Sequence, residues 1–168
     1  QLVGREAEIA MLRAIADKAL AGNGQAVGIM GEAGSGKSRL VEEIAGYAAS
    51  VVWPMAVLSG ECLSYGQSMA YLPFVTLLRH YFGLAEGTEP ADAVARVLQT
   101  VEERAGDQAR FAPLLGNLLG LPIPENEITR SLPPQQRRQR TMELVKTLLY
   151  NEARRQPLII VLEDLHWI

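Results

Sequence analysis

The eight residues from Gly31 to Ser38 read GEAGSGKS, and they fit the pattern G-x-x-x-x-G-K-[ST] at every position. Glycines in this pattern let the main chain curl so that successive N–H groups point inward around a bound phosphate. The Lys37 ammonium could then reach the β- and γ-phosphates of a nucleotide, and the Ser38 hydroxyl could ligate a magnesium ion. The segment is therefore a candidate phosphate-binding loop.

Two acidic residues, Glu163 and Asp164, follow the apolar run at residues 157–162. A magnesium-nucleotide site needs one carboxylate near the metal ion and a second that orients or deprotonates the attacking water. Consecutive side chains of a strand point in different directions, so adjacent acids can divide these two tasks. Because a complete phosphate-loop pattern is also present, we interpret the pair as metal-binding and catalytic. The alternative is an ordinary turn after a strand.

Strands and helices must position both motifs. Short apolar runs predict strands at residues 25–30, 51–59 and 157–162, and the first and last of these are expected to be buried. Apolar spacing of three and four predicts helices over 6–21, from 37, from 73, from 90, over 111–119 and over 135–155. The proline-rich stretch 121–134 is a candidate linker. Strands that alternate with helices predict an α/β layered fold with a parallel sheet, where ligands bind at the carboxyl ends of strands.

The composition is that of a globular chain: 168 residues, 48% hydrophobic, 21% charged, with a formal net charge of −3. No apolar run approaches the roughly 20 residues that a membrane-spanning helix needs, so we expect a cytoplasmic protein without membrane contact. A single cysteine excludes an intrachain disulfide framework. No direct nucleic-acid binding is expected, because no aromatic stacking platform accompanies the one arginine cluster, at 130, 137, 138 and 140.

Three segments together resemble the AAA-like ATPase module of STAND-class proteins, which are signal-transduction ATPases with numerous domains. They are the opening LVGREAEIAML, the loop GEAGSGKS and the ending LIIVLEDLHW. The segment GECLSYGQSMAYLPFVTLLR is also similar to a region of the ATPases associated with class III adenylate/guanylate cyclases. The class includes large bacterial transcriptional regulators. The resemblance covers nearly the whole chain and implies a P-loop NTPase three-layer fold.

The resemblance implies a role for each matching residue. Glu163 would coordinate Mg²⁺ together with Ser38, Asp164 would activate water, and these two acids would form the catalytic set with Lys37. Gly4 and Arg5 match the G-R-E element of the family, which lies near the adenine or ribose. The residues expected to bind ATP are, in full, Gly4, Arg5, Gly31, Ala33, Gly34, Ser35, Gly36, Lys37, Ser38 and Arg39.

The resemblance also implies that the chain is the N-terminal part of one P-loop ATPase domain, truncated after the Walker B strand. Its expected parts are the N-terminal helix with the G-R-E element (1–24), the phosphate-loop unit (25–60), a mostly helical insert (61–156) and the Walker B strand (157–168). The family continues with a further strand, an arginine element and a winged-helix domain. That further strand would lie between the phosphate-loop strand and the acidic strand.

We therefore expect ATP binding and slow hydrolysis in a multidomain signalling or transcriptional regulator. The expected partners are ATP and ADP, downstream domains of the same longer chain, and a second copy through ATP-dependent self-association. Two alternatives stay open: a nucleotide-binding switch or scaffold without significant turnover, and a small-molecule kinase. The kinase would need an acceptor site and a lid rich in arginine. The choice of ATP over GTP rests on the resemblance.

Overall fold

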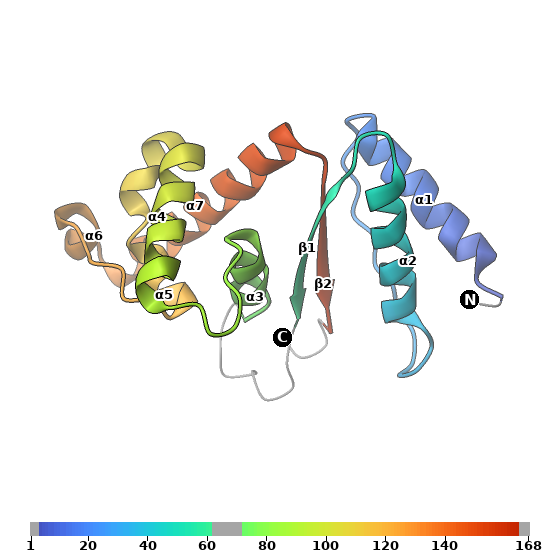
Figure 1. The fold of residues 1–168 in the computed structure, drawn as a ribbon, viewed down its shortest axis with the longest axis horizontal. Coiled ribbons are helices and arrows are strands. Elements are labelled where there is room, and N and C mark those ends of the chain that lie inside the picture. The colour runs from blue at the N-terminus through green and yellow to red at the C-terminus, as the bar shows by residue number, and fades with distance from the viewer. Residues whose placement is uncertain (1–3, 62–71, 165–168) are drawn as a thin grey trace. The chain divides into compact units, whose positions relative to one another are not determined.

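A computed structural model of the chain describes residues 4–61 and 72–164 (Figure 1). The helices are α1 (Glu6–Leu20), α2 (Lys37–Ser50), α3 (Leu72–Tyr81), α4 (Pro90–Ala105), the 3-10 helix η2 (Gly106–Phe111), α5 (Leu114–Leu119), α6 (Glu127–Ser131) and α7 (Pro134–Arg155). The strands are β1 (Ala56–Glu61) and β2 (Leu158–Glu163). The chain divides into a first unit, residues 1–57 and 156–161, and a second unit, residues 58–155 and 162–168.

The helices predicted over 6–21 and from 37 are confirmed as α1 and α2, and in the first unit α1 packs along α2 (Figure 1). Small side chains let the two helices approach, since Ala16 of α1 and Ala48 of α2 are buried together with Met55. The Tyr47 hydroxyl donates a hydrogen bond of 2.6 Å to Asp17 Oδ1, which joins the helices at their surface. After α1 the chain turns at Gly22, whose φ of +87° suits glycine.

The predicted buried strand over residues 25–30 is wrong for this structure. The segment is extended but not a strand, and it is mostly exposed: Val27 is 48% exposed and Met30 93%. In the part of the chain that the structure describes, the sheet contains β1 and β2, and the segment belongs to neither. An apolar run becomes a strand only where a neighbouring strand completes its hydrogen bonds, and among the residues that the structure describes this segment has no such neighbour.

Strands β1 and β2 pair in parallel, and the chain between them is mostly helical where the structure describes it (Figure 1). At the start of β1, the Ala56 N–H donates to the Pro157 carbonyl at 2.7 Å. The strand predicted over 51–59 thus begins later, after Pro54. The strand predicted over 157–162 is confirmed as β2, but its side chains are half-buried rather than buried, and Ile160 is 44% exposed.

Glycine is required at Gly60 of β1 by a close approach within the second unit. A β-carbon at this position would lie 2.1 Å from the Pro73 carbonyl oxygen, at the start of α3. That distance is far inside van der Waals contact, and backbone cannot yield as a flexible side chain can. The bare glycine therefore lets the strand pass directly beside the helix that follows it.

The second unit is helical, and the predicted helices from 73, from 90 and over 135–155 are confirmed as α3, α4 and α7. The predicted helix over 111–119 is divided between the end of η2 and α5. Its fully buried large side chains come from four helices and the α6 turn: Leu77, Leu78, Val97, Val101, Leu115, Thr129, Leu144 and Leu148. An ion pair between Arg104 and Glu152 joins α4 to α7.

The candidate linker at 121–134 is not irregular, because it contains α6. Asn126 caps this short helix: its side chain accepts from the Thr129 N–H at 2.8 Å, and Thr129 Oγ1 accepts from the Asn126 N–H at 3.2 Å. Arg137 of α7 pairs with Glu125 and donates to the Thr129 carbonyl at 2.6 Å. The prolines predicted a break, but this capping box and the Arg137 contacts fix the segment onto α7.

Candidate functional site

The phosphate-loop motif forms the turn that leads into α2, within the first unit. Gly34 and Gly36 have φ values of +75° and +87°, the left-handed conformation that glycine adopts at little cost. The Ser35 N–H donates to the Glu32 carbonyl at 3.2 Å, which closes the turn. A β-carbon on Gly31 would lie 2.6 Å from Ser35 Oγ. The glycines of the motif therefore stand where the fold of the loop requires them.

Lys37 is the first residue of α2, and its side chain turns back over the loop. Its ammonium donates to the Gly31 carbonyl at 3.0 Å and to the Glu32 carbonyl at 2.9 Å. These acceptors are neutral, whereas phosphate oxygens are charged and make hydrogen bonds roughly twice as strong. The ammonium therefore lies at the loop and could exchange its carbonyl partners for an anion.

The N-terminus of α2 adds further donors at the same place. Its N-cap is Gly36, and in the described chain no side chain hydrogen-bonds the cap. The first N–H groups of a helix lack partners within the helix, and the helix dipole is positive at this end. Ser38 lies exposed in the first turn. The loop glycines, the lysine and the helix terminus together suit the binding of a phosphate group. The Ser38 hydroxyl is suited to serve as a ligand of a magnesium ion.

Arg5 contacts the loop from the N-terminal side. Its Nη2 donates to the Ser35 carbonyl at 3.1 Å, across 30 residues of sequence. Its Nη1 donates to Glu8 Oε1 at 2.7 Å, and this hydrogen bond holds the pKa of the Glu8 carboxyl below its ordinary value. Neighbouring Gly4 has a φ of +81°. The structure thus brings Arg5 to the phosphate loop, a contact that no spacing in the sequence could have indicated.

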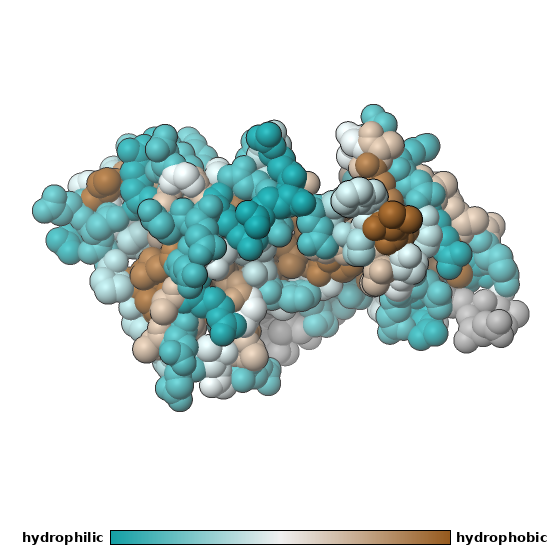
Figure 2. Space-filling model, turned by 45° about the horizontal axis from the view of Figure 1, so that its top comes forward, coloured by the Kyte–Doolittle hydropathy of each residue, from teal (hydrophilic) through white to brown (hydrophobic). Residues whose placement is uncertain are grey.

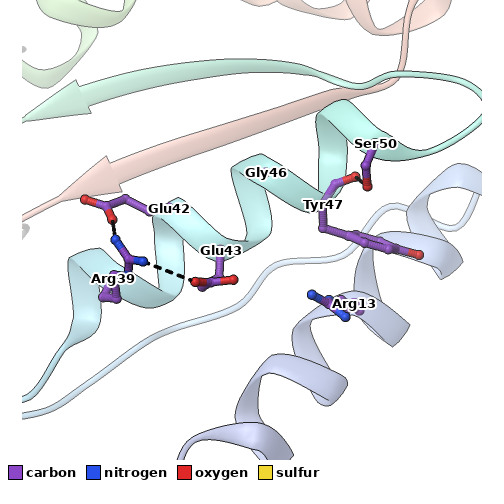
Figure 3. Close-up of a pocket in the computed structure, with 7 residues that line it drawn as sticks. All are labelled: Arg13, Arg39, Glu42, Glu43, Gly46, Tyr47 and Ser50. Atoms are coloured by element: carbon purple, nitrogen blue, oxygen red, sulfur yellow. Dashed lines mark hydrogen bonds and ion pairs between the residues drawn. The ribbon is translucent and has the colours of Figure 1, made fainter. Parts of the chain in front are cut away.

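Arg39, another residue predicted to bind nucleotide, lies on the outer face of α2. Figure 3 shows its guanidinium paired with Glu42 at 2.7 Å and Glu43 at 3.6 Å. These side chains line a surface hollow of about 600 Å³ together with Arg13, Gly46, Tyr47 and Ser50. The hydrogen bond to Asp17 raises the pKa of the Tyr47 hydroxyl at its edge. A role of Arg39 in nucleotide binding stays a prediction.

The two predicted acids end β2. Glu163 is its last residue, and Asp164 follows with a φ of +56°, the only positive φ of a non-glycine residue among those described. Aspartate tolerates this conformation better than most residues, and such backbone outliers concentrate at functional sites. Both acids belong to the second unit, whereas the loop belongs to the first. That the acids and the loop form one site stays a prediction.

The helices carry no membrane-spanning segment: within residues 4–61 and 72–164, none is both long enough and apolar enough to cross a bilayer. Isolated apolar side chains do reach the surface, where Figure 2 shows brown atoms scattered among teal ones. The exposed large apolar residues of the first unit include Val52 and Trp53. Single exposed apolar residues are normal on globular proteins.

The α/β architecture and the glycine-lysine loop fit a module of the P-loop class. In agreement, the family model described as "AAA ATPase domain" matches residues 1–168, so the chain belongs to the AAA ATPase domain family and has the P-loop NTPase fold. An uncharacterized protein of Rhizobium meliloti (strain 1021) is 31% identical over 172 residues, covering 99% of this chain. The chain spans 16% of the length of that relative. No solved structure matches.

Proposed function

We propose that this chain binds ATP, with the triphosphate held by the loop from Gly31 to Ser38. The observation that carries the proposal is the position of Lys37, whose ammonium lies at the Gly31 and Glu32 carbonyls of a loop shaped by glycines. Family membership supports the nucleotide as the source of the phosphates. The ammonium and the loop N–H groups would neutralise phosphate charge, most strongly where negative charge develops during transfer.

We propose further that Ser38 and Glu163 hold Mg²⁺ and that Asp164 orients the attacking water. Bound Mg²⁺ would supply charge neutralisation at the phosphate oxygens. An oxygen-only donor set of hydroxyl and carboxylate suits this hard cation. The left-handed Asp164 supports a separate task for that residue, because its backbone turns away from the strand direction that Glu163 keeps.

ATP hydrolysis coupled to a conformational switch is the activity that we propose for the whole protein, a multidomain signalling or transcriptional regulator of the STAND class. The partners would be downstream domains of a longer chain and, with ATP bound, a second copy. Support comes from the length of the Rhizobium relative, of which this chain spans 16%. In the first unit the apolar side chains of Val27 and Met30 are exposed. Their exposure supports a further strand of the longer chain, which would cover residues 25–30 and pair with them in the sheet.

Calorimetric titration with ATP, ADP and GTP, each with and without Mg²⁺, tests the proposal. We expect saturable binding of ATP and ADP. Mg²⁺ should change the affinity for ATP, because Ser38 and Glu163 are both proposed to bind the ion. Chelation of Mg²⁺ with EDTA should reverse that change. Absence of binding to every nucleotide at millimolar concentration would reject the function.

A further inference from the structure

The Arg5 side chain reaches the loop from outside the motif, because its Nη2 donates to the Ser35 carbonyl at 3.1 Å. Its other terminal nitrogen, Nη1, is held by Glu8 Oε1 at 2.7 Å. The two bonds use the fork of the guanidinium, in which donors lie at fixed angles in one plane. The guanidinium thus connects the first turn of α1 to one particular peptide group of the phosphate loop.

That peptide group joins Ser35 to Gly36, so a contact that fixes the Ser35 carbonyl also fixes the direction of the Gly36 N–H. The described peptide bonds are all trans, so the C=O and the N–H of a peptide group point in opposite directions. When Arg5 draws the Ser35 carbonyl toward itself, the Gly36 N–H is turned to the opposite side. Glycine on each side of Ser35, at 34 and 36, leaves this peptide free to rotate unless something holds it.

Arg5 is attached to a pair of packed helices. Arg5 stands at the N-cap of α1, and α1 packs on α2 around Ala16 and Ala48. Asp17 and Tyr47 join the same two helices by their hydrogen bond of 2.6 Å. Since α2 begins directly after the loop, Arg5 closes a ring that runs through α1, α2 and the loop, all within the first unit.

We propose that Arg5 is a positioning residue of the phosphate site: it fixes the Ser35–Gly36 peptide so that the Gly36 N–H is aimed at the phosphate before the ligand arrives. This inference rests on the proposed function, because it assigns Arg5 to the triphosphate rather than to the base or ribose. Prealigned donors bind an anion more tightly than donors that must first be ordered. Glu8 serves the same end indirectly, by holding the guanidinium.

The test compares ATP with inorganic tripolyphosphate, which has the phosphates but neither base nor ribose. We expect Arg5→Ala to weaken the binding of both ligands by a similar factor, about tenfold, as for loss of one charge-assisted hydrogen bond. Arg5→Lys should restore only part of the affinity, since one nitrogen cannot serve both partners. Arg13→Ala removes an arginine from the same helix, one that lies over the Tyr47 ring, and should leave both affinities unchanged.

Two results would overturn the positioning role: a loss for ATP alone, which would place Arg5 at the base or ribose, or unchanged affinity for both ligands. Amide hydrogen exchange of residues 31–38 in the ligand-free chain gives a second readout, and exchange should be several-fold faster in Arg5→Ala than in Arg13→Ala. Failure of the wild-type chain to bind either ligand would reject the proposed function. In that event equal exchange rates in the two variants would reject the positioning role as well.

Discussion

Replacing Lys37 with alanine should reduce ATP affinity by about a hundredfold or more. In the structure the Lys37 ammonium makes two hydrogen bonds to loop carbonyls, at 3.0 and 2.9 Å. In the complex it would make charge-assisted bonds to phosphate, each worth about 1.5–3 kcal/mol, and two such bonds correspond to at least a hundredfold in affinity. Calorimetric titration of wild type and variant with Mg·ATP measures the loss.

Lys18→Ala provides the matched control for Lys37→Ala. Lys18 is exposed in the last turn of α1, so its removal changes the net charge equally without touching the loop. We expect its ATP affinity to stay within about twofold of wild type, because a single distant charge is screened at physiological salt. Far-UV circular dichroism and the unfolding midpoint check that both variants fold. A folded Lys37→Ala chain that binds ATP as tightly as wild type would remove the phosphate loop from the site.

The second large effect concerns turnover rather than binding. Asp164→Asn should lower single-turnover ATP hydrolysis by about 10²–10⁴-fold, the usual contribution of a general base. Asparagine suits this test because it also accepts the left-handed conformation seen at φ +56°, so the backbone after β2 is preserved while the charge is removed. Radioactive phosphate release from γ-labelled ATP measures the rate.

The comparison of Asp164→Asn with Glu163→Gln separates the two acids. For Asp164→Asn we expect ATP affinity close to that of wild type, and for Glu163→Gln a loss of the Mg²⁺ dependence of binding. Equal losses of affinity and turnover in Asp164→Asn would mean that the roles of the acids are exchanged. Wild-type turnover at the background rate, with ATP binding intact, would favour the nucleotide-binding switch over the ATPase.

Helix positions could be predicted from the sequence because burial repeats with the period of a helix. In α7, Val145 and Leu148 are buried, as is the neighbouring Leu144. Met142 and Leu149, which the helical spacing predicts to face inward with Val145 and Leu148, are half-buried. Local patterns of this kind need no knowledge of distant residues. The start of α2 at Gly36 and Lys37 could also be predicted from a local pattern, because the phosphate-loop motif lies within eight consecutive residues.

The features that could not be predicted from the sequence depend on contacts with residues that are distant in the chain. Residues 25–30 look like a strand by composition, yet Met30 is 93% exposed, because a strand is made by its neighbours in the sheet. The stretch 121–134 looks like a linker by its prolines, yet the Asn126 cap and Arg137 order it. The Arg5–Ser35 contact joins residues 30 apart and has no periodic signature.

One bound metal–nucleotide complex should touch both motifs, and paramagnetic broadening by Mn²⁺·ATP tests this most directly. Mn²⁺ accepts the same oxygen ligands as Mg²⁺ and broadens the amide signals of residues close to it. We predict selective broadening at two places in the ¹⁵N-labelled chain, Gly36–Ser38 at the loop and Glu163–Asp164 after β2. Broadening confined to either motif, with the other as sharp as in the Mg²⁺·ATP complex, would contradict a shared site.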